Sequence, residues 1–236
     1  MDRTVDFFIV GAQKGGTTGL DHYLRRHDQI QMARMKEVHH FDDETRVDWS
    51  DPNHDRLHSA FDWGKPVIVR GETSSIYAYW PPESLSFRNA IFPMGRERVS
   101  AAHRIFLYVE RGFCASQLER LFSFFPRPHI HVVKSEHLWC DPGDVLSTLE
   151  VFLGVEPRLA DVANAGYVVP VDATGAGEVA DQDRQYLNEL FHDDIGRTAE
   201  LTGLDLSRWL SADYREPMQP LASAAHRMTF PAHPIF

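Results

Sequence analysis

The sequence is poor in cysteine and contains no long apolar run. Its two cysteines, Cys114 and Cys140, are too few for a disulfide framework and lack metal-ligand spacing. We expect both to be core or half-buried thiols in a reducing compartment. No segment approaches the roughly 18 consecutive apolar residues of a membrane helix, and the first residues lack the layout of a secretory signal. These absences predict a cytoplasmic protein without a membrane span.

The sequence also lacks an excess of basic residues. With 24 Lys and Arg against 34 Asp and Glu, the formal net charge is −10. This argues against a general nucleic-acid binder, whose surface would be basic, and counts against a long polyanionic substrate. The length of 236 residues predicts a single domain over residues 1–236. Within it, residues 217–236 are rich in proline and alanine and predict an irregular tail.

Apolar patterns predict strands that alternate with helices along the chain. Strands are expected at residues 5–10, 31–33, 66–69 and 129–133, and helices at 17–27, 112–125, 144–153 and 183–202. Strands separated by helices favour a mostly parallel sheet with helices on both faces. The predicted fold class is therefore α/β, with three layers and a mostly parallel central sheet.

The first predicted strand runs into the loop GAQKGGTT, residues 11–18. Its glycines allow a tight turn that aims successive backbone N–H groups inward. Thr17 and Thr18 begin a helix whose N-terminus favours an anion, and Lys14 adds a mobile positive charge. The alternative is a turn that needs glycine only for its geometry, with Lys14 solvated. We favour a phosphate site.

This loop differs from that of the nucleotide triphosphatases. Their pattern, GxxxxGK[ST], places a magnesium-ligating hydroxyl directly after the lysine, whereas Lys14 precedes Gly15 and Gly16. No predicted apolar strand ends in an aspartate suited to hold magnesium. A phosphate ligand bound without metal fits these residues better.

A second stretch whose side chains could take part in catalysis is KEVHHFD, residues 36–42. In extended backbone, Glu37 and His39 point to the same side, and a carboxylate beside a histidine can take a proton from an alcohol or amine. The alternative is a charged surface turn. The chain has thirteen histidines, so incidental pairs are common.

The two stretches FIVGAQKGGTT and KEVHHFD together resemble the sulfotransferases that use 3′-phosphoadenosine 5′-phosphosulfate (PAPS), which share a three-layer P-loop fold. The sequence is most similar to the glycosaminoglycan (heparan sulfate)-type branch and its bacterial relatives. The resemblance covers most of the chain, because it continues at residues 71–77, 111–118, 125–126, 133–142, 152–154 and 204–209.

The resemblance implies roles for individual residues. The loop would bind the 5′-phosphosulfate of the donor through Gln13, Lys14, Gly15, Gly16, Thr17 and Thr18. Lys14 would lie by the bridging oxygen, where negative charge grows as the S–O bond breaks. Glu37 would be the general base, His39 would act beside it, and His39 and Asp42 would shape the acceptor site. The acceptor would be a hydroxyl or amine of a small molecule, natural product or carbohydrate. No metal is required.

The sequence departs from the family in three places. The Arg-Asp-Pro or Arg-Asn-Pro turn and the serine that bind the 3′-phosphate are absent between Ser84 and Leu85, although both flanks match. Losing an interior strand would leave backbone groups unpaired. We therefore expect omitted residues and a spatial break there, with a second break near residues 165–167. The family has a basic loop where this sequence has residues 164–172, and the resemblance is weak there. Thr73 stands at a position where the family often has lysine.

Two other functions stay open. A P-loop small-molecule kinase would also bind phosphate at residues 11–18, but it is disfavoured by the missing GK[ST] pattern. A nucleotide-binding module without catalysis would explain the missing Arg-x-Pro turn.

Overall fold

The computed structural model describes residues 3–12, 15–41, 48, 51–74, 112–159 and 180–214. At its centre lies a parallel sheet whose described strands are β1 Phe7–Ile9, β2 Ile30–Met32 and β3 Val69–Thr73. The strand order is β1-β3-β2, and Gly71 of β3 is the register partner of both Phe7 and Met32. Because all three strands run in the same direction, their carboxyl ends meet at one edge of the sheet.

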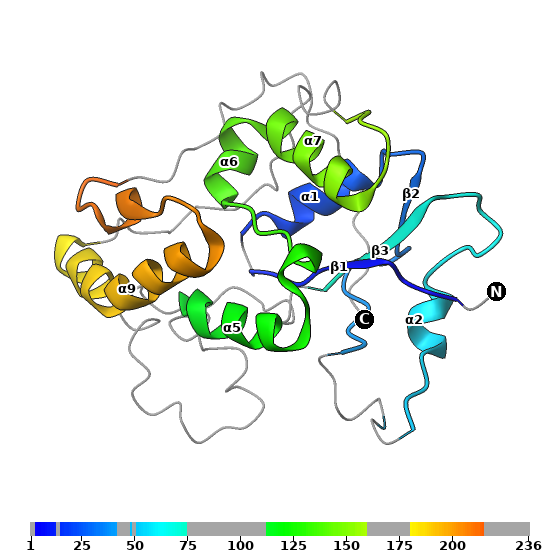
Figure 1. The fold of residues 1–236 in the computed structure, drawn as a ribbon, viewed down its shortest axis with the longest axis horizontal. Helices are drawn as coiled ribbons and strands as arrows, with labels where there is room; N and C mark the ends of the chain where they lie inside the picture. The colour runs from blue at the N-terminus through cyan, green and yellow to red at the C-terminus, as the bar shows by residue number, and fades with distance from the viewer. Residues whose placement is uncertain are drawn as a thin grey trace.

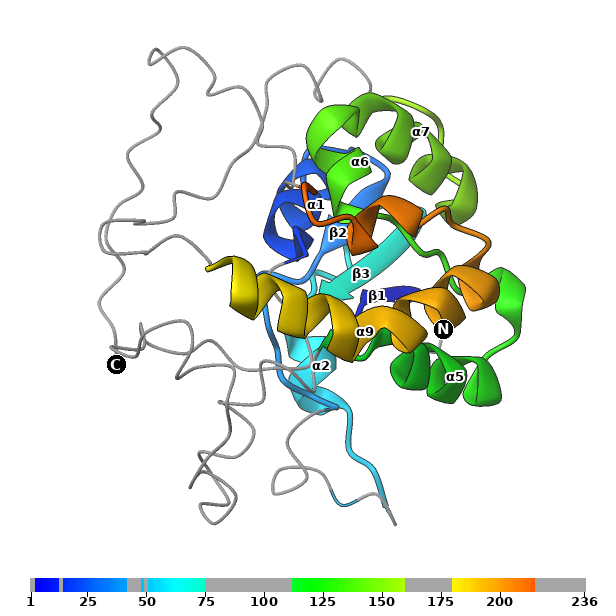
Figure 2. The same ribbon diagram turned by 90° about the vertical axis from the view of Figure 1, so that its left-hand side faces the viewer.

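Helices cover both faces of this sheet. The helices on one side are α1 (Thr17–Leu24), α6 (Ser135–Cys140) and α7 (Pro142–Leu153), and those on the other are α2 (Asp55–Ser59) and α5 (Cys114–Phe124) (Figures 1 and 2). The long helix α9 (Asp181–Thr202) packs against α5. The 3₁₀ helices are η2 (Arg127–His129) and η3 (Ser207–Leu210). The predicted three-layer α/β fold with a parallel sheet is confirmed.

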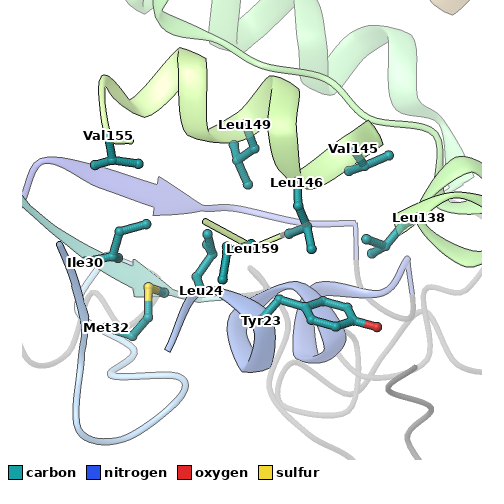
Figure 3. Close-up of a cluster of buried hydrophobic side chains, with 10 residues drawn as sticks. All are labelled: Tyr23, Leu24, Ile30, Met32, Leu138, Val145, Leu146, Leu149, Val155 and Leu159. Carbon is teal, nitrogen blue, oxygen red and sulfur yellow. The ribbon is translucent and has the colours of Figure 1, made fainter. Parts of the chain in front are cut away.

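Alternate side chains of the strands enter different layers. Phe7 and Ile9 pack on the cluster that lies between the sheet and helices α1 and α7. Phe8 packs on a second cluster, which lies between the sheet and α2. A parallel sheet covered on both faces buries apolar side chains on both. The first cluster, shown in Figure 3, contains the buried residues Tyr23, Leu24, Ile30, Met32, Leu138, Val145, Leu146, Leu149, Val155 and Leu159.

Helix α7 begins and ends at local sequence signals. The Asp141 carboxylate accepts a hydrogen bond from the backbone N–H of Asp144 at 3.1 Å, and Pro142 occupies the first turn, where no N–H is needed. Gly154 ends the helix in a left-handed conformation with φ 69°. The helix therefore ends at Leu153, where the sequence predicts its end.

The same helix contributes a buried carboxylate to the core. Glu150 has no exposed surface, and its Oε1 accepts the backbone N–H groups of Arg158 at 2.7 Å and Leu159 at 2.9 Å. The buried ring of His27 lies 3.4 Å from the same oxygen through its Nε2. All of these contacts involve Oε1, and Oε2 is buried without a hydrogen-bond partner among the described residues. Through Oε1, Glu150 fastens the segment after α7 to the end of α1.

Helix α5 is capped by a residue from α9. The carboxylate of Asp194 accepts the backbone N–H groups of Cys114 at 2.9 Å and Ala115 at 3.1 Å, and the rings of Phe113 and Phe191 lie 5.0 Å apart. Burial, together with the charge of Asp194, raises the pKa of the Cys114 thiol. Cys114 is therefore a structural, unreactive thiol.

Three sequence expectations require correction. The strand predicted at residues 129–133 is wrong: His129 lies in η2, and residues 130–134 are in no helix or strand. Ile130 is extended (φ −120°, ψ 116°), but a strand also needs a partner alongside it, and the described sheet provides none there. The first helix ends at Leu24, short of residue 27. Cys140 is exposed.

Several expectations fall on residues that the structure does not describe. The expected break between Ser84 and Leu85 and the second one near residues 165–167 lie outside the described ranges, as does the predicted tail at 217–236. Among the helices of the described residues, none is both long and apolar enough to cross a membrane.

The packing in Figure 3 predicts a large stability difference between two positions of α7. Leu146 is fully buried, whereas Val151 is 75% exposed. Leu146→Ala should lower the free energy of unfolding by about 2–5 kcal/mol, because it removes buried methyl groups and leaves a cavity. Val151→Ala should change it by no more than about 0.5 kcal/mol. Urea denaturation of both variants measures the difference, and equal losses would contradict this placement of α7.

Candidate functional site

The end of β3 lies between the segments that follow its two neighbouring strands. The backbone N–H of Ser74 donates to the carbonyl of Ile9, the last residue of β1, at 3.2 Å. The carbonyl of Thr73 accepts from the N–H of Glu37, which follows β2, at 2.9 Å. In open α/β sheets, ligands bind at the carboxyl ends of the strands. This edge is therefore the candidate site.

The loop after β1 leads directly into α1. The N–H of Gly15 donates to the carbonyl of Ala12 at 3.0 Å, and Gly16 precedes the helix in a left-handed conformation with φ 94°. Thr17 and Thr18 open the helix, as the sequence predicts. No described side chain caps this end. The N–H groups of the first turn and the helix dipole therefore favour an anion here.

Helix α6 lies directly behind the loop. A Cβ atom on Gly16 would lie 3.0 Å from Cη2 of Trp139 and 3.1 Å from Cδ2 of Leu138, and one on Gly15 would lie 3.0 Å from the carbonyl oxygen of Ala12. Such approaches are closer than ordinary packing allows. At Gly16 the positive φ adds a second reason for glycine. Gly16 thus lets the loop lie against α6, and Gly15 allows the turn to close on the backbone of Ala12.

Glu136 holds α6 in this position. Its carboxylate lies 2.5 Å from Nζ of Lys134 and accepts hydrogen bonds from the hydroxyl of Tyr214 at 2.8 Å and the indole of Trp209 at 3.3 Å. Burial by itself would raise the pKa of Glu136, but the hydrogen bonds from Lys134, Tyr214 and Trp209 and the charge of Lys134 lower it below its ordinary value. Glu136 therefore stays ionised and ties α6 to η3 and the residues that follow it.

Helix α1 is fixed to the end of β3 by a buried carboxylate. Asp21 accepts a hydrogen bond at 2.8 Å from the hydroxyl of Thr73, which is 1% exposed. The guanidinium of Arg25, one turn further along α1, donates to the other oxygen of Asp21 at 2.6 Å. Helix α1, which begins at the glycine loop, therefore cannot shift without breaking contacts to β3.

Glu37 and His39 lie in a turn that is also attached to β3. Both residues have left-handed backbones, with φ 67° and 52°, and not the extended backbone in which their side chains would point to the same side. The N–H of Glu37 donates to Thr73, and the N–H of Val38 donates to the buried carboxylate of Glu72 at 2.9 Å. These contacts to β3 hold the turn in its left-handed conformation.

The turn nevertheless brings the two predicted side chains together. Nε2 of His39 lies 3.3 Å from Oε2 of Glu37, and Nζ of Lys36 lies 3.3 Å from Oε1. The side chain of Glu37 is 15% exposed and that of His39 is 27% exposed. A carboxylate held between two nitrogen groups, with part of its surface reachable, can accept a proton from a bound alcohol or amine.

The histidine next in sequence points into the protein. His40 is buried, and its Nε2 lies 2.8 Å from Nδ1 of His54, so that one ring donates and the other accepts. Burial, and then the proximity of His54, Arg56 and His58, lower the pKa of His40. His40 is therefore neutral at neutral pH and fastens the residue before α2 to the segment that carries Glu37.

The structure places six of the predicted site residues: Gly15, Gly16, Thr17, Thr18, Glu37 and His39. Gln13, Lys14 and Asp42 lie outside the described residues. Sequence reasoning missed Asp21 and Glu72: Asp21 stands in a predicted helix and Glu72 just after a predicted strand, and nothing in either segment distinguishes them from surface carboxylates. Within the described ranges, no group of three or more His, Cys, Asp or Glu side chains could hold a metal ion, and the expectation of a reaction without metal stays a prediction.

Comparison with known proteins adds to this geometry. The sequence matches no protein-family model and no curated protein. The structure is similar to the crystal structure of a sulfotransferase from Alicyclobacillus acidocaldarius, with a TM-score of 0.67 and 25% sequence identity. The match covers 89% of this chain and 100% of that chain. The chain therefore has the three-layer α/β fold of a bacterial sulfotransferase.

Proposed function

We propose that the protein is a sulfotransferase that moves a sulfuryl group from PAPS to a hydroxyl or amine of a small-molecule, natural-product or carbohydrate acceptor. The observation that carries the proposal is the attachment of two segments to the end of β3 in a fold shared with a sulfotransferase. One segment is α1, which follows the glycine loop and is joined to Thr73 through Asp21, and the other contains Glu37. We further propose that the protein acts in the cytoplasm.

The residues of the loop fit the phosphate part of the donor. Gly15 and Gly16 present backbone without side chains, and α1 begins there with no described side chain over its N-terminus. The N–H groups of the first turn and the hydroxyls of Thr17 and Thr18 would bind the 5′-phosphate oxygens. Gln13 and Lys14, between Ala12 and Gly15, would complete this site. The phosphate would then be held as the leaving group, in line with the attack of the acceptor on the sulfur atom.

Charge stabilisation falls to Lys14 in this proposal. PAPS, when bound, supplies the sulfuryl group. The S–O bond that breaks leaves its electron pair on the bridging oxygen of the phosphate. An ammonium group beside that oxygen stabilises the transition state more than the ground state. Lys14 would take this position from the loop.

Deprotonation of the acceptor falls to Glu37. Its carboxylate would take the proton of the attacking hydroxyl or amine, while His39, 3.3 Å away, orients the carboxylate and contacts the acceptor. Asp42 would contribute to the acceptor site. The net charge of −10 favours a small or weakly charged acceptor over a long polyanion such as a glycosaminoglycan.

Two measurements test the proposal directly. Adenosine 3′,5′-bisphosphate without magnesium should raise the melting temperature of the protein, since bound ligand stabilises the folded state. Labelled PAPS should transfer its sulfuryl group to at least one member of a panel of phenols, alcohols, amines and sugars. Stabilisation by magnesium-ATP alone would instead favour a kinase. Binding of the bisphosphate without transfer to any acceptor would favour a non-catalytic module.

The proposed role of Lys14 predicts a specific catalytic defect. Lys14→Ala should raise the activation free energy by about 2–4 kcal/mol, as removal of an oriented charge-stabilising group does, while the melting temperature stays unchanged. The exposed Lys65 is the matched control, and Lys65→Ala should retain wild-type turnover. Measured kcat values for both variants decide the point: an unchanged kcat for Lys14→Ala removes this residue from the mechanism.

The proposed base predicts a second defect. Glu37→Gln keeps the shape of the side chain but cannot accept a proton, so kcat should fall about 10²–10⁴-fold with little change in bisphosphate affinity. Glu119→Gln, which removes an exposed carboxylate on α5, is the control and should leave kcat unchanged. If His39→Ala proves far more damaging than Glu37→Gln, the base is not Glu37.

A further inference from the structure

Glu72 is a carboxylate at the end of β3 to which neither the sequence motifs nor the proposed chemistry assigns a role. The residue is 1% exposed, and its Oε1 accepts the backbone N–H of Val38 at 2.9 Å. Val38 is itself 3% exposed and belongs to the apolar cluster beneath α2. The hydrogen bond therefore lies in the protein interior, where an unpaired amide or carboxylate would be costly.

This hydrogen bond acts on the centre of an unusual turn. Val38 lies between Glu37 and His39, both of which have the left-handed backbone that residues with side chains rarely adopt. Two successive N–H groups of the turn bind two successive residues of β3: Glu37 binds the carbonyl of Thr73, and Val38 binds the carboxylate of Glu72. Strained backbone of this kind persists only where surrounding contacts fix it.

We propose that Glu72 is a positioning residue, whose buried carboxylate holds the turn at Val38 so that Glu37 and His39 face the acceptor. This inference rests on the proposed function of Glu37. Glu72 acts through the reach of its oxygen to the Val38 amide, without touching either substrate. Its 1% exposure keeps it away from the acceptor, whereas part of the Glu37 side chain is reachable.

Two conservative substitutions distinguish the effect of the length of the Glu72 side chain from the effect of its charge. Glu72→Gln keeps the length of the side chain and an oxygen that can accept the Val38 N–H, but it removes the negative charge. Glu72→Asp keeps the charge but is one methylene shorter, which withdraws the oxygen from Val38. Glu150→Asp is the matched control, because it shortens another fully buried carboxylate that accepts backbone N–H groups far from the turn.

The experiment measures amide hydrogen exchange at Val38 together with kcat and KM on the purified full chain. Glu72→Asp should lose the protection of the Val38 amide and lower kcat by about 10²-fold, the scale of a small misplacement of a catalytic group. The KM for PAPS should change little, because α1, which begins at the proposed phosphate loop, is held to β3 by the hydrogen bond between Asp21 and Thr73 and not by Glu72. Glu72→Gln should retain both protection and kcat. Glu150→Asp should lower the melting temperature without changing either.

The opposite ranking overturns the inference: wild-type kcat in Glu72→Asp together with a large loss in Glu72→Gln would mean that Glu72 acts by its charge. Unchanged protection of the Val38 amide in Glu72→Asp would overturn it as well. If the wild-type protein transfers no sulfuryl group, the proposed function fails. The exchange measurement then still tests whether Glu72 holds the turn.

Discussion

The candidate site depends on the way in which β3 ends. The carbonyl of Thr73 accepts the N–H of Glu37, and its hydroxyl donates to Asp21 on the helix that begins at the phosphate loop. A single buried residue thus connects the proposed donor side and the proposed acceptor side. Transfer between two bound molecules requires their reacting atoms to be held within a fraction of an ångström of the productive geometry. Fixing both sides to one strand meets this requirement, because neither can move independently of the other.

The second constraint on the site is charge. A chain with a net charge of −10 is proposed to bind a highly anionic donor, so the positive potential has to be local. Asp21 lies just beyond the first turn of α1, where its charge would oppose an anion at the helix N-terminus. Its ion pair with Arg25 at 2.6 Å neutralises it. The backbone N–H groups of the first turn are then left to act on the ligand, together with Lys14.

The parts of the structure that could be predicted from sequence are those with local signals. Glycines followed by threonines predict the turn into α1, and Asp141, Pro142 and Gly154 mark both ends of α7. These signals act through atoms a few residues apart. The strand expected at residues 129–133 fails for the opposite reason: the residue pattern favours extended backbone, but pairing needs a partner that sequence does not specify.

The acceptor side shows the same limit more clearly. The spacing of Glu37 and His39 correctly predicts that their side chains meet, but the backbone that brings them together is left-handed. That conformation follows from contacts to Thr73 and Glu72, which are more than 30 residues away in sequence. Buried carboxylates such as Glu72 are also hard to identify from sequence, because a glutamate is usually a surface residue.

Thr73 gives this site a different charge balance from that of the family the sequence resembles. That family often has a lysine at this position, whose ammonium group would add a second cation near the donor. Here the side chain is a buried hydroxyl bound to Asp21, so it cannot carry that charge. Lysine would also have to displace this hydrogen bond, on which the placement of α1 depends. Residue 73 therefore serves to join α1 to β3. In the proposed mechanism, the charge that develops on the bridging oxygen therefore falls more heavily on Lys14 and the N-terminus of α1.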